Sequence, residues 1–191
     1  MPLDIVILGP PGAGKGTQAQ RISAELGLPH VNTGDMLRGE TKAGTELGRQ
    51  AADVMSRGEL MPDEIVVELV RRRLADEDAA GGSVIDGFPR TLAQARALDR
   101  ILARMDRELT VVLDFQLPEE VAVQRLLARA RPDDRPEVIR RRLEVQRVPD
   151  ELVEYYRARG ILVGIHADRS VDEVFAEVQS VLETAAARSP R

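Results

Sequence analysis

A glycine-rich segment near the start of the chain constrains the fold more than any other feature. The sequence GPPGAGKGT occupies residues 9–17, directly after the apolar run Leu3–Leu8 and at the start of a helical pattern over residues 14–26. Glycines in such a loop let backbone N–H groups converge on phosphate oxygens, and a helix N-terminus adds partial positive charge. Lys15 supplies a full charge for the terminal phosphates. The segment therefore predicts a strand, a phosphate-binding loop and a helix.

The rest of the chain alternates between strand-like and helix-like segments. Short apolar runs predict further strands at residues 29–32, 83–86, 110–117 and 161–165. Between them the spacing of apolar residues predicts two short helices within 33–61 and helices at 63–78, 91–105, 118–129 and 171–187. It also predicts one long helix from 136 to 159 with a possible break at Pro149. Strands that alternate with helices predict an α/β fold with a parallel sheet covered on both faces.

Composition excludes several classes of function. The chain has 43% hydrophobic and 31% charged residues and no run of about 18 apolar residues, so we expect a globular protein that does not span a membrane. It has no cysteine, which excludes disulfides, zinc sites made of thiolates and cysteine nucleophiles. The net charge of −5 argues against general nucleic-acid binding. The glycine loop follows the first residue too closely for a signal peptide, so we expect a cytoplasmic location.

Four other nucleotide-binding classes have sequence patterns that can be compared with this chain. Gly16 stands where the standard loop has Ser or Thr to reach magnesium, and Thr17 follows it. Residues 14–19 also fit the dinucleotide pattern G-x-G-x-x-G/A, with Asp35 about 20 residues on, so an NAD-binding module stays an alternative. The guanine-reading motif Asn-Lys-x-Asp and the kinase motif His-Arg-Asp are absent. A P-loop switch or hydrolase that binds ATP alone is the remaining alternative.

A second motif, DGFPRTLAQ at residues 86–94, follows the predicted strand at 83–86. A carboxylate at the end of a buried strand is a common ligand for magnesium and its waters. Asp86 is therefore the favoured magnesium residue, and Asp114 in the next strand is its competitor. Gly87 and Arg90 follow Asp86 at the expected edge of the sheet, which favours Asp86.

Arginines gather on either side of the turn at residues 131–136. Of the 27 lysine and arginine residues only Lys15 and Lys42 are lysine, so a part of this set reflects the general use of arginine in the chain. Two helix ends joined by a short turn can still direct several guanidinium groups into one cleft, where they bind phosphate oxygens in a bidentate manner. By contrast, the run at residues 71–73 is expected to be a solvated helix face. The candidate cluster consists of Arg125, Arg129, Arg131, Arg135, Arg140, Arg141, Arg142 and Arg147.

Taken together, these motifs resemble those of the adenylate kinases. The resemblance covers nearly the whole chain and rests on GPPGAGKGT at 9–17, NTGDMLR at 32–38, GELMPDEIV at 58–66, DGFPRTLAQ at 86–94 and RARPDD at 129–134. It implies a P-loop three-layer fold with a five-stranded parallel sheet in a single kinase domain, residues 1–191. It also implies a helical AMP-binding flap at 32–61 and a short lid at 129–136 without the inserted segment of long-lid members.

The resemblance implies roles for individual residues. For ATP binding it implicates Gly12, Ala13, Gly14, Lys15, Gly16, Thr17, Arg125, Arg129 and Arg169. For AMP binding it implicates Thr33, Arg38, Glu59, Leu60, Met61, Gly87, Arg90, Gln94, Arg131 and Arg142. The implied catalytic residues are Lys15, Arg90, Arg129, Arg131 and Arg142, and the implied magnesium residue is Asp86, which binds through water. The implied contact of Arg169 with the donor adenine is the least direct, because the family often has glycine near this position.

The implied reaction is the reversible transfer of the γ-phosphoryl group of Mg-ATP to AMP, which gives two ADP. The implied cofactor is Mg²⁺ without a structural zinc, and the implied partners are ATP, AMP and ADP for a monomeric enzyme. Related UMP/CMP kinases tend to have Asn after DGFPR, whereas this chain has Thr91, which favours AMP. Another nucleoside monophosphate kinase stays an alternative.

Overall fold

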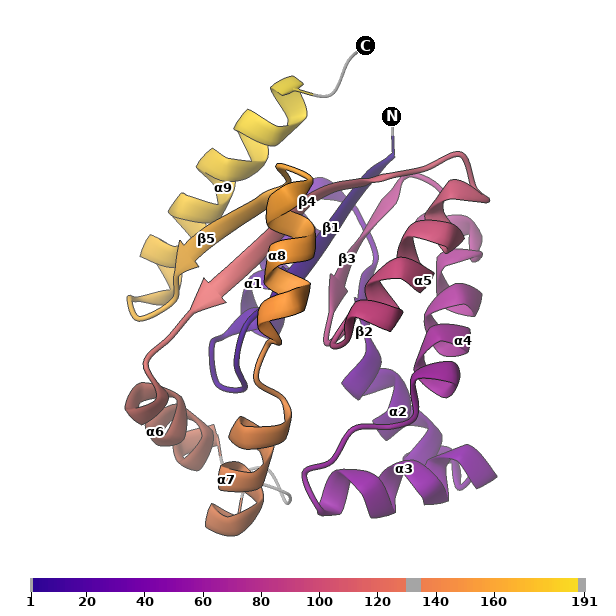
Figure 1. Cartoon of the computed structure of the whole chain (residues 1–191), viewed down its shortest axis with the longest axis vertical. Helices are drawn as coiled ribbons and strands as arrows, with labels where there is room; N and C mark the ends of the chain where they lie inside the picture. The colour runs from indigo at the N-terminus through magenta and orange to yellow at the C-terminus, as the bar shows by residue number, and fades with distance from the viewer. Residues whose placement is uncertain (1, 130–134, 189–191) are drawn as a thin grey trace.

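A five-stranded parallel sheet forms the centre of the molecule. The structure, a computed structural model of the chain, describes residues 2–129 and 135–188. The strands are hydrogen-bonded in the order β2-β3-β1-β4-β5, and helices cover both faces (Figure 1). The predicted α/β fold with five parallel strands is confirmed. The elements are β1 Leu3–Leu8, α1 Lys15–Leu26, β2 His30–Asn32, α2 Thr33–Ala43, α3 Glu46–Ser56, α4 Asp63–Leu74, the 3-10 turn η1 Glu77–Ala79, β3 Gly82–Asp86, α5 Leu92–Ala103, β4 Leu109–Gln116, α6 Glu119–Arg129, α7 Pro136–Val145, α8 Asp150–Ala158, β5 Leu162–His166 and α9 Val171–Arg188.

The central strand β1 is buried on both faces, and its residues alternate between two cores. Ile5 and Ile7 pack in the core that α1 and α9 cover. Val6 and Leu8 pack in the core on the opposite face, which α4, α5 and α8 cover. Because both faces are covered, the strand is hydrophobic at every position from Ile5 to Leu8 rather than at alternate positions.

The carboxyl ends of the strands meet at one edge of the sheet, and four helices extend beyond that edge. In Figure 1, α2 and α3 lie beyond β2 and β3, while α6 and α7 lie on the β4 side. The two helices predicted within residues 33–61 are α2 and α3. They pack tightly at Gly48. A Cβ at this position would lie 2.1 Å from the Glu40 carbonyl oxygen. Residues 130–134 of the expected lid lie outside the described residues.

Two predicted helices are shorter than expected. The helix predicted from 136 to 159 is split into α7 and α8, because Pro149 lacks an N–H and its ring cannot follow a helical turn; Pro149 instead precedes the first residue of α8. The helix predicted over 63–78 ends at Leu74, and a 3-10 turn follows it. Over the described ranges 2–129 and 135–188, no helix is long and apolar enough to cross a membrane.

A buried ion pair joins three segments at the opposite, amino end of the sheet. Asp4 in β1 is fully buried and accepts a hydrogen bond of 2.9 Å from Arg107 Nε, while the Arg107 side chain is 4% exposed. Ser83 in β3 donates to the same carboxylate at 2.7 Å. Removing one partner from such a pair leaves an uncompensated buried charge, which costs more than the pair contributes.

We expect Asp4→Ala to lower the free energy of unfolding by about 3–5 kcal/mol, because it leaves the Arg107 guanidinium buried without a counter-charge. The matched control is Asp172→Ala, since Asp172 pairs with Arg21 on the surface with its side chain 89% exposed. This control should cost about 0–1 kcal/mol. Urea unfolding measures both values, and equal losses would contradict the structural role given to Asp4.

Candidate active site

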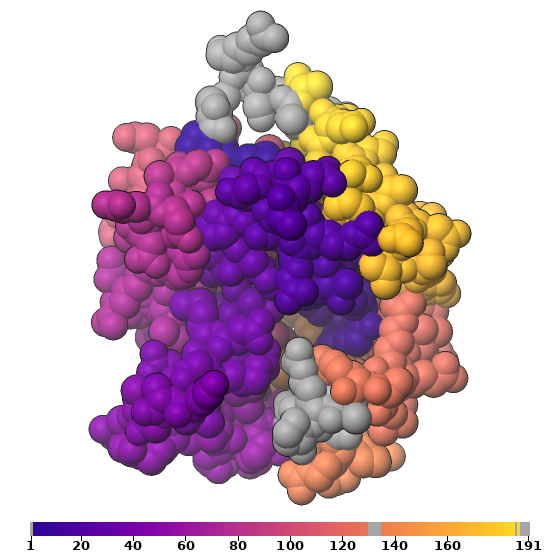
Figure 2. Space-filling model, turned by 180° about the vertical axis from the view of Figure 1, so that it is seen from behind, coloured from indigo at the N-terminus to yellow at the C-terminus, as the bar shows by residue number. Residues whose placement is uncertain are grey.

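One large cavity opens at the carboxyl edge of the sheet. Its volume is about 730 Å³, within the range typical of small-molecule sites. Figure 2 shows the surface hollowed between α1 and α2 on one side and α6 on the other. Segments far apart in the sequence line it: the phosphate loop, α2, the end of α3, the loop after β3, α6, α7 and the loop after β5.

The phosphate loop folds tightly between β1 and α1. A Cβ at Gly12, where φ is +85°, would lie 2.8 Å from the Ala122 carbonyl oxygen of α6, so only glycine fits there. The Lys15 ammonium donates to the carbonyl oxygens of Gly9 and Pro10, both at 2.8 Å. Burial lowers the Lys15 pKa to about 8. The nearby carboxylate acts to raise that pKa, and two nearby guanidinium groups act to lower it further.

Asp86 ends β3 and is 4% exposed. Asn32 Nδ2 donates to Asp86 Oδ2 at 2.7 Å, and His30 Nε2 lies 3.7 Å from the same oxygen, beyond hydrogen-bond distance. Burial alone would raise the pKa of the Asp86 carboxyl. The neighbouring His30 and Lys15, with Arg90, outweigh burial and lower that pKa, so the group is an anion at neutral pH.

The position of Asp86 distinguishes it from Asp114, the competing candidate. Asp86 Oδ2 would lie 3.6 Å from a Cβ placed at Gly16, so this carboxylate faces the first turn of α1. Asp114 in β4 does not line the cavity and has Arg157 of α8 as its charged neighbour. Among the described residues there is no group of three or more His, Asp or Glu side chains that could hold a metal ion. A single carboxylate such as Asp86 could hold a magnesium ion through water molecules, with phosphate oxygens as the other ligands of the ion.

Four predicted residues form one hydrogen-bonded group around the loop after β3. Thr33 Oγ1 donates to the Gly87 carbonyl oxygen at 3.0 Å, and Arg90 Nε donates to the same oxygen at 2.8 Å. A Cβ at Gly87 would lie 2.7 Å from Thr33 Oγ1, so any residue larger than glycine would clash at this position. Gln94, 2% exposed, accepts from the Arg90 backbone N–H at 2.7 Å. The group places one guanidinium, one hydroxyl and one amide on the same wall.

The remaining predicted residues of the flap also line the cavity. Arg38 forms an ion pair with Asp35 on α2, and Glu59 forms one with Arg57. Leu60 and Met61 add apolar side chains to the cavity lining.

Arginines from α6 and α7 line the far side. Arg125 donates to the carbonyl oxygens of Ala167 and Arg169, at 2.8 and 3.4 Å. Arg129 and Arg142 also line the cavity, and Arg142 is 7% exposed. Arg131 lies outside the described residues.

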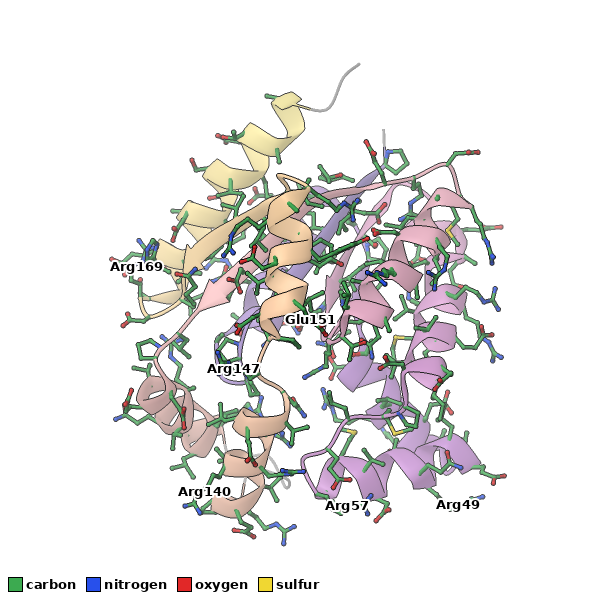
Figure 3. All side chains as sticks on the ribbon, in the orientation of Figure 1. Arg49, Arg57, Arg140, Arg147, Glu151 and Arg169 are labelled. Atoms are coloured by element: carbon green, nitrogen blue, oxygen red, sulfur yellow. The ribbon has the colours of Figure 1, made fainter. Side chains whose placement is uncertain are left out.

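Arg169 is the predicted residue whose side chain fits its expected role least. Arg169 lines the cavity, but its guanidinium pairs with Glu177 of α9 and donates to the His166 carbonyl oxygen. Figure 3 shows it at the outer margin, beside the loop between β5 and α9. The run at 71–73 is a surface feature as predicted, since Arg71 and Arg72 pair with Glu68.

Sequence reasoning missed three side chains of this cavity and its walls. Asn32 holds Asp86 and also caps α2 by accepting from the Asp35 N–H at 2.8 Å. Asp63 in the first turn of α4 accepts from Gln94 Nε2 at 2.7 Å. Gln146 follows α7 and contacts Arg90. Asn32 and Asp63 lie within the motifs that were singled out, but Gln146 carries no sequence signal, because its role depends on the break between α7 and α8.

Comparison with known proteins agrees with this geometry. The family model described as adenylate kinase matches residues 7–161. An adenylate kinase of Corynebacterium urealyticum is 46% identical over 171 residues, which is 89% of this chain and 93% of that protein. One from Thermus thermophilus is 47% identical over 183 residues, covering 93% and 96% of the two chains. One from Thermobifida fusca is 46% identical over 187 residues, covering 95% and 99%.

The matches span the phosphate loop, the loop after β3 and the arginines of α6 and α7. The chain belongs to the adenylate kinase family.

Proposed function

We propose that this nucleoside monophosphate kinase transfers the γ-phosphoryl group of Mg-ATP directly and reversibly to AMP, giving two ADP. The observation that carries the proposal is the single cavity onto which the phosphate loop and the Arg90 wall both open. Two nucleotides bound there can bring their phosphates together, so no covalent intermediate on the enzyme is needed. In the cell the reaction would balance the adenine nucleotides.

The donor occupies the phosphate-loop side of the cavity in this proposal. Residues 12–17 surround the ATP phosphates, with Lys15 at the transferred group. Arg125 and Arg129 of α6 add positive charge on the same side. The backbone near Arg169 approaches the adenine, while its guanidinium stays paired with Glu177.

The acceptor occupies the side formed by α2, the end of α3 and the loop after β3. Thr33 and the backbone of residues 59–61 lie along the adenine, Gln94 reads its edge, and Arg38 and Arg90 hold the AMP phosphate beside Gly87. Arg142 reaches the phosphates across the point of transfer. Arg131 is assigned to that position by the family resemblance alone.

The chemistry requires position and positive charge more than proton transfer. The AMP phosphate is already ionised, so its oxygen attacks in line without a general base. Lys15, Arg90, Arg129 and Arg142 surround the place where negative charge accumulates in the transition state. Because these groups are fixed by the fold before reaction, little reorganisation is needed as charge develops.

Magnesium fits the same cavity. Asp86 is buried, ionised and directed toward the first turn of α1, so it would hold the ion through water, with Thr17 nearby. When bound, magnesium neutralises part of the charge that two nucleotides bring together. We propose no structural zinc, since the chain has no cysteine to bind one.

The proposal extends to the organisation of the chain. Residues 32–61 act as the flap that closes over the acceptor, and residues 129–136 act as the lid that excludes water before transfer. A monomer is the expectation from the family. A cytoplasmic enzyme that binds small nucleotides and neither nucleic acid nor membranes is the expectation from its family and its acidic charge.

We expect ADP to form only with AMP when the protein is incubated with Mg-ATP and each of AMP, UMP, CMP and GMP. Chromatography of the nucleotides should give two ADP for each AMP consumed. Rapid ADP formation with UMP or CMP would assign another acceptor. ADP with free phosphate, whatever the acceptor, would indicate a hydrolase and contradict the acceptor site at Arg38 and Arg90.

We expect kcat/KM for ATP to fall about tenfold per pH unit above about pH 8, because the free enzyme loses the Lys15 proton there. Bound phosphate favours the charged amine, so kcat should decline only at higher pH. The control is Lys15→Arg, whose guanidinium stays charged. Its residual activity should be flat between pH 7 and 9.5, and a wild-type profile flat to pH 10 would contradict the role of Lys15.

We expect Arg90→Ala to lower kcat/KM for AMP by about 10²–10³, because a charged donor aimed at the transferring phosphates is lost. KM for ATP should change less than about threefold. Arg90→Lys keeps the charge without the planar fork and should recover only part of the loss. Steady-state kinetics with each nucleotide varied in turn measures both effects. A defect confined to ATP would place the acceptor elsewhere.

A further inference from the structure

The junction between α7 and α8 places an uncharged side chain among the charged groups of the cavity. Gln146 follows the last residue of α7, and its backbone N–H donates to the Arg142 carbonyl oxygen at 2.9 Å. Its side chain is partly buried and lines the cavity. Figure 3 labels the next residue, Arg147, where the chain leaves α7 for α8.

The two ends of the Gln146 amide contact two different parts of the acceptor site. Oε1 accepts from Arg90 Nη1 at 2.8 Å, and Nε2 donates to the Gly58 carbonyl oxygen at 3.4 Å. A guanidinium can only donate and a carbonyl oxygen can only accept, so the amide has one possible orientation here. It links the loop after β3 to the last turn of the flap.

The contact with Gln146 fixes the direction of the Arg90 guanidinium. Nε donates to the Gly87 carbonyl oxygen at 2.8 Å and Nη1 donates to Gln146, so two acceptors hold two edges of the plane. Within residues 2–129 and 135–188, Nη2 donates to no protein group. The guanidinium is thus held rigidly with one edge available to an anion, which lowers the ordering cost of binding a phosphate.

An uncharged residue is suited to this position. Burial lowers the Arg90 pKa, the Asp86 carboxylate acts to raise it, and the neighbouring Arg142 guanidinium lowers it further. A carboxylate in place of the amide would pair with Arg90 and compete with the incoming phosphate. An amide orients the guanidinium without neutralising it.

The flap contacts α7 beside this amide. A Cβ at Gly58 would lie 3.0 Å from the Val138 carbonyl oxygen and 3.4 Å from the Arg142 backbone nitrogen. In Figure 3, Arg57 marks the end of α3, and α7, which carries Arg140 on its outer side, lies beside it. The hydrogen bond from Gln146 to Gly58 therefore forms where the flap meets α7.

We infer that Gln146 is a positioning residue for the acceptor: it orients Arg90 toward the AMP phosphate and couples that orientation to the contact between the flap and α7. The inference rests on the proposed function of Arg90. Gln146 itself does not touch the reacting atoms, so its effect is transmitted through Arg90 and Gly58.

The test compares Gln146→Met and Gln146→Glu with the wild type by steady-state kinetics and by calorimetric titration of AMP. Met keeps the length and packing of the side chain but loses both hydrogen bonds, so KM and Kd for AMP should rise about tenfold. KM for ATP should stay within twofold. Glu has nearly the same shape as Gln, so a packing role predicts normal AMP binding for it, whereas we expect an AMP defect at least as large as that of Met.

The matched control is Gln50→Met, an exposed glutamine on α3 away from the cavity, which should leave both KM values unchanged. Thermal unfolding of all variants should agree within a few degrees. Normal AMP binding in Gln146→Met, or equal losses for ATP and AMP, would overturn the inference. So would an AMP defect in Gln146→Met that Gln146→Glu fully rescues.

A double-mutant cycle separates this inference from the proposed function. In an Arg90→Ala background, Gln146→Met should add less than a twofold further change in AMP affinity, because the residue it orients is gone. Additive losses would overturn the inference while leaving the acceptor site intact. If Arg90→Ala itself leaves AMP binding unchanged, the assignment of Arg90 to the acceptor fails, and the inference fails with it.

Discussion

The parallel pairing of β1 between β3 and β4 is the constraint on which the rest of the molecule depends. Ile7 pairs with Asp86, the last residue of β3, and Leu8 pairs with Asp114 of β4, which continues to Gln116. Parallel strands direct all their carboxyl ends to one edge. The phosphate loop and the loop after β3 consequently face each other across one cavity, although about 70 residues of chain separate them. No interaction between the loops is needed to bring them together.

The cavity brings several charged side chains close together at the carboxyl edge of the sheet. Lys15, Arg90, Arg129 and Arg142 line it, and Asp86 is the buried anion at the end of β3. The pKa values of Lys15 and Arg90 are lowered, which shows that holding these cations in place costs folding free energy. In the proposed function, nucleotide phosphates supply the opposite charge. Bound phosphates would therefore make the electrostatic environment of these cations favourable. Such an arrangement, which lowers the stability of the free protein, is expected at a functional site.

Much of the fold followed from the sequence because its signals were local. The strand Leu3–Leu8 is apolar apart from Asp4, and the glycine loop after it permits few other conformations. The position of Asp86 was also predictable, since it ends a short apolar strand next to a glycine. The break at Pro149 was less certain, because a proline can start a helix as well as end one. The helix after Asp63 ended early at Leu74, since nothing in its spacing distinguishes a last helical turn from a 3-10 turn.

The sequence predicted which types of residue line the cavity, but it did not predict which residues contact one another there. The sequence indicated arginines near the turn at 131–136, but it did not show that the Arg169 guanidinium pairs with Glu177, because the loop after β5 had to be placed against α9 first. The contacts of the Asn32 and Gln146 side-chain amides could not be predicted for the same reason. Asn32 holds Asp86, and Gln146 holds Arg90, each through a hydrogen bond between segments more than 50 residues apart. Both amides are neutral neighbours of a charged group, and each orients that group while leaving its charge for the nucleotide. A carboxylate or a cation at either position would alter the charge on which phosphate binding depends, so the cavity depends on its uncharged residues as well as on its arginines.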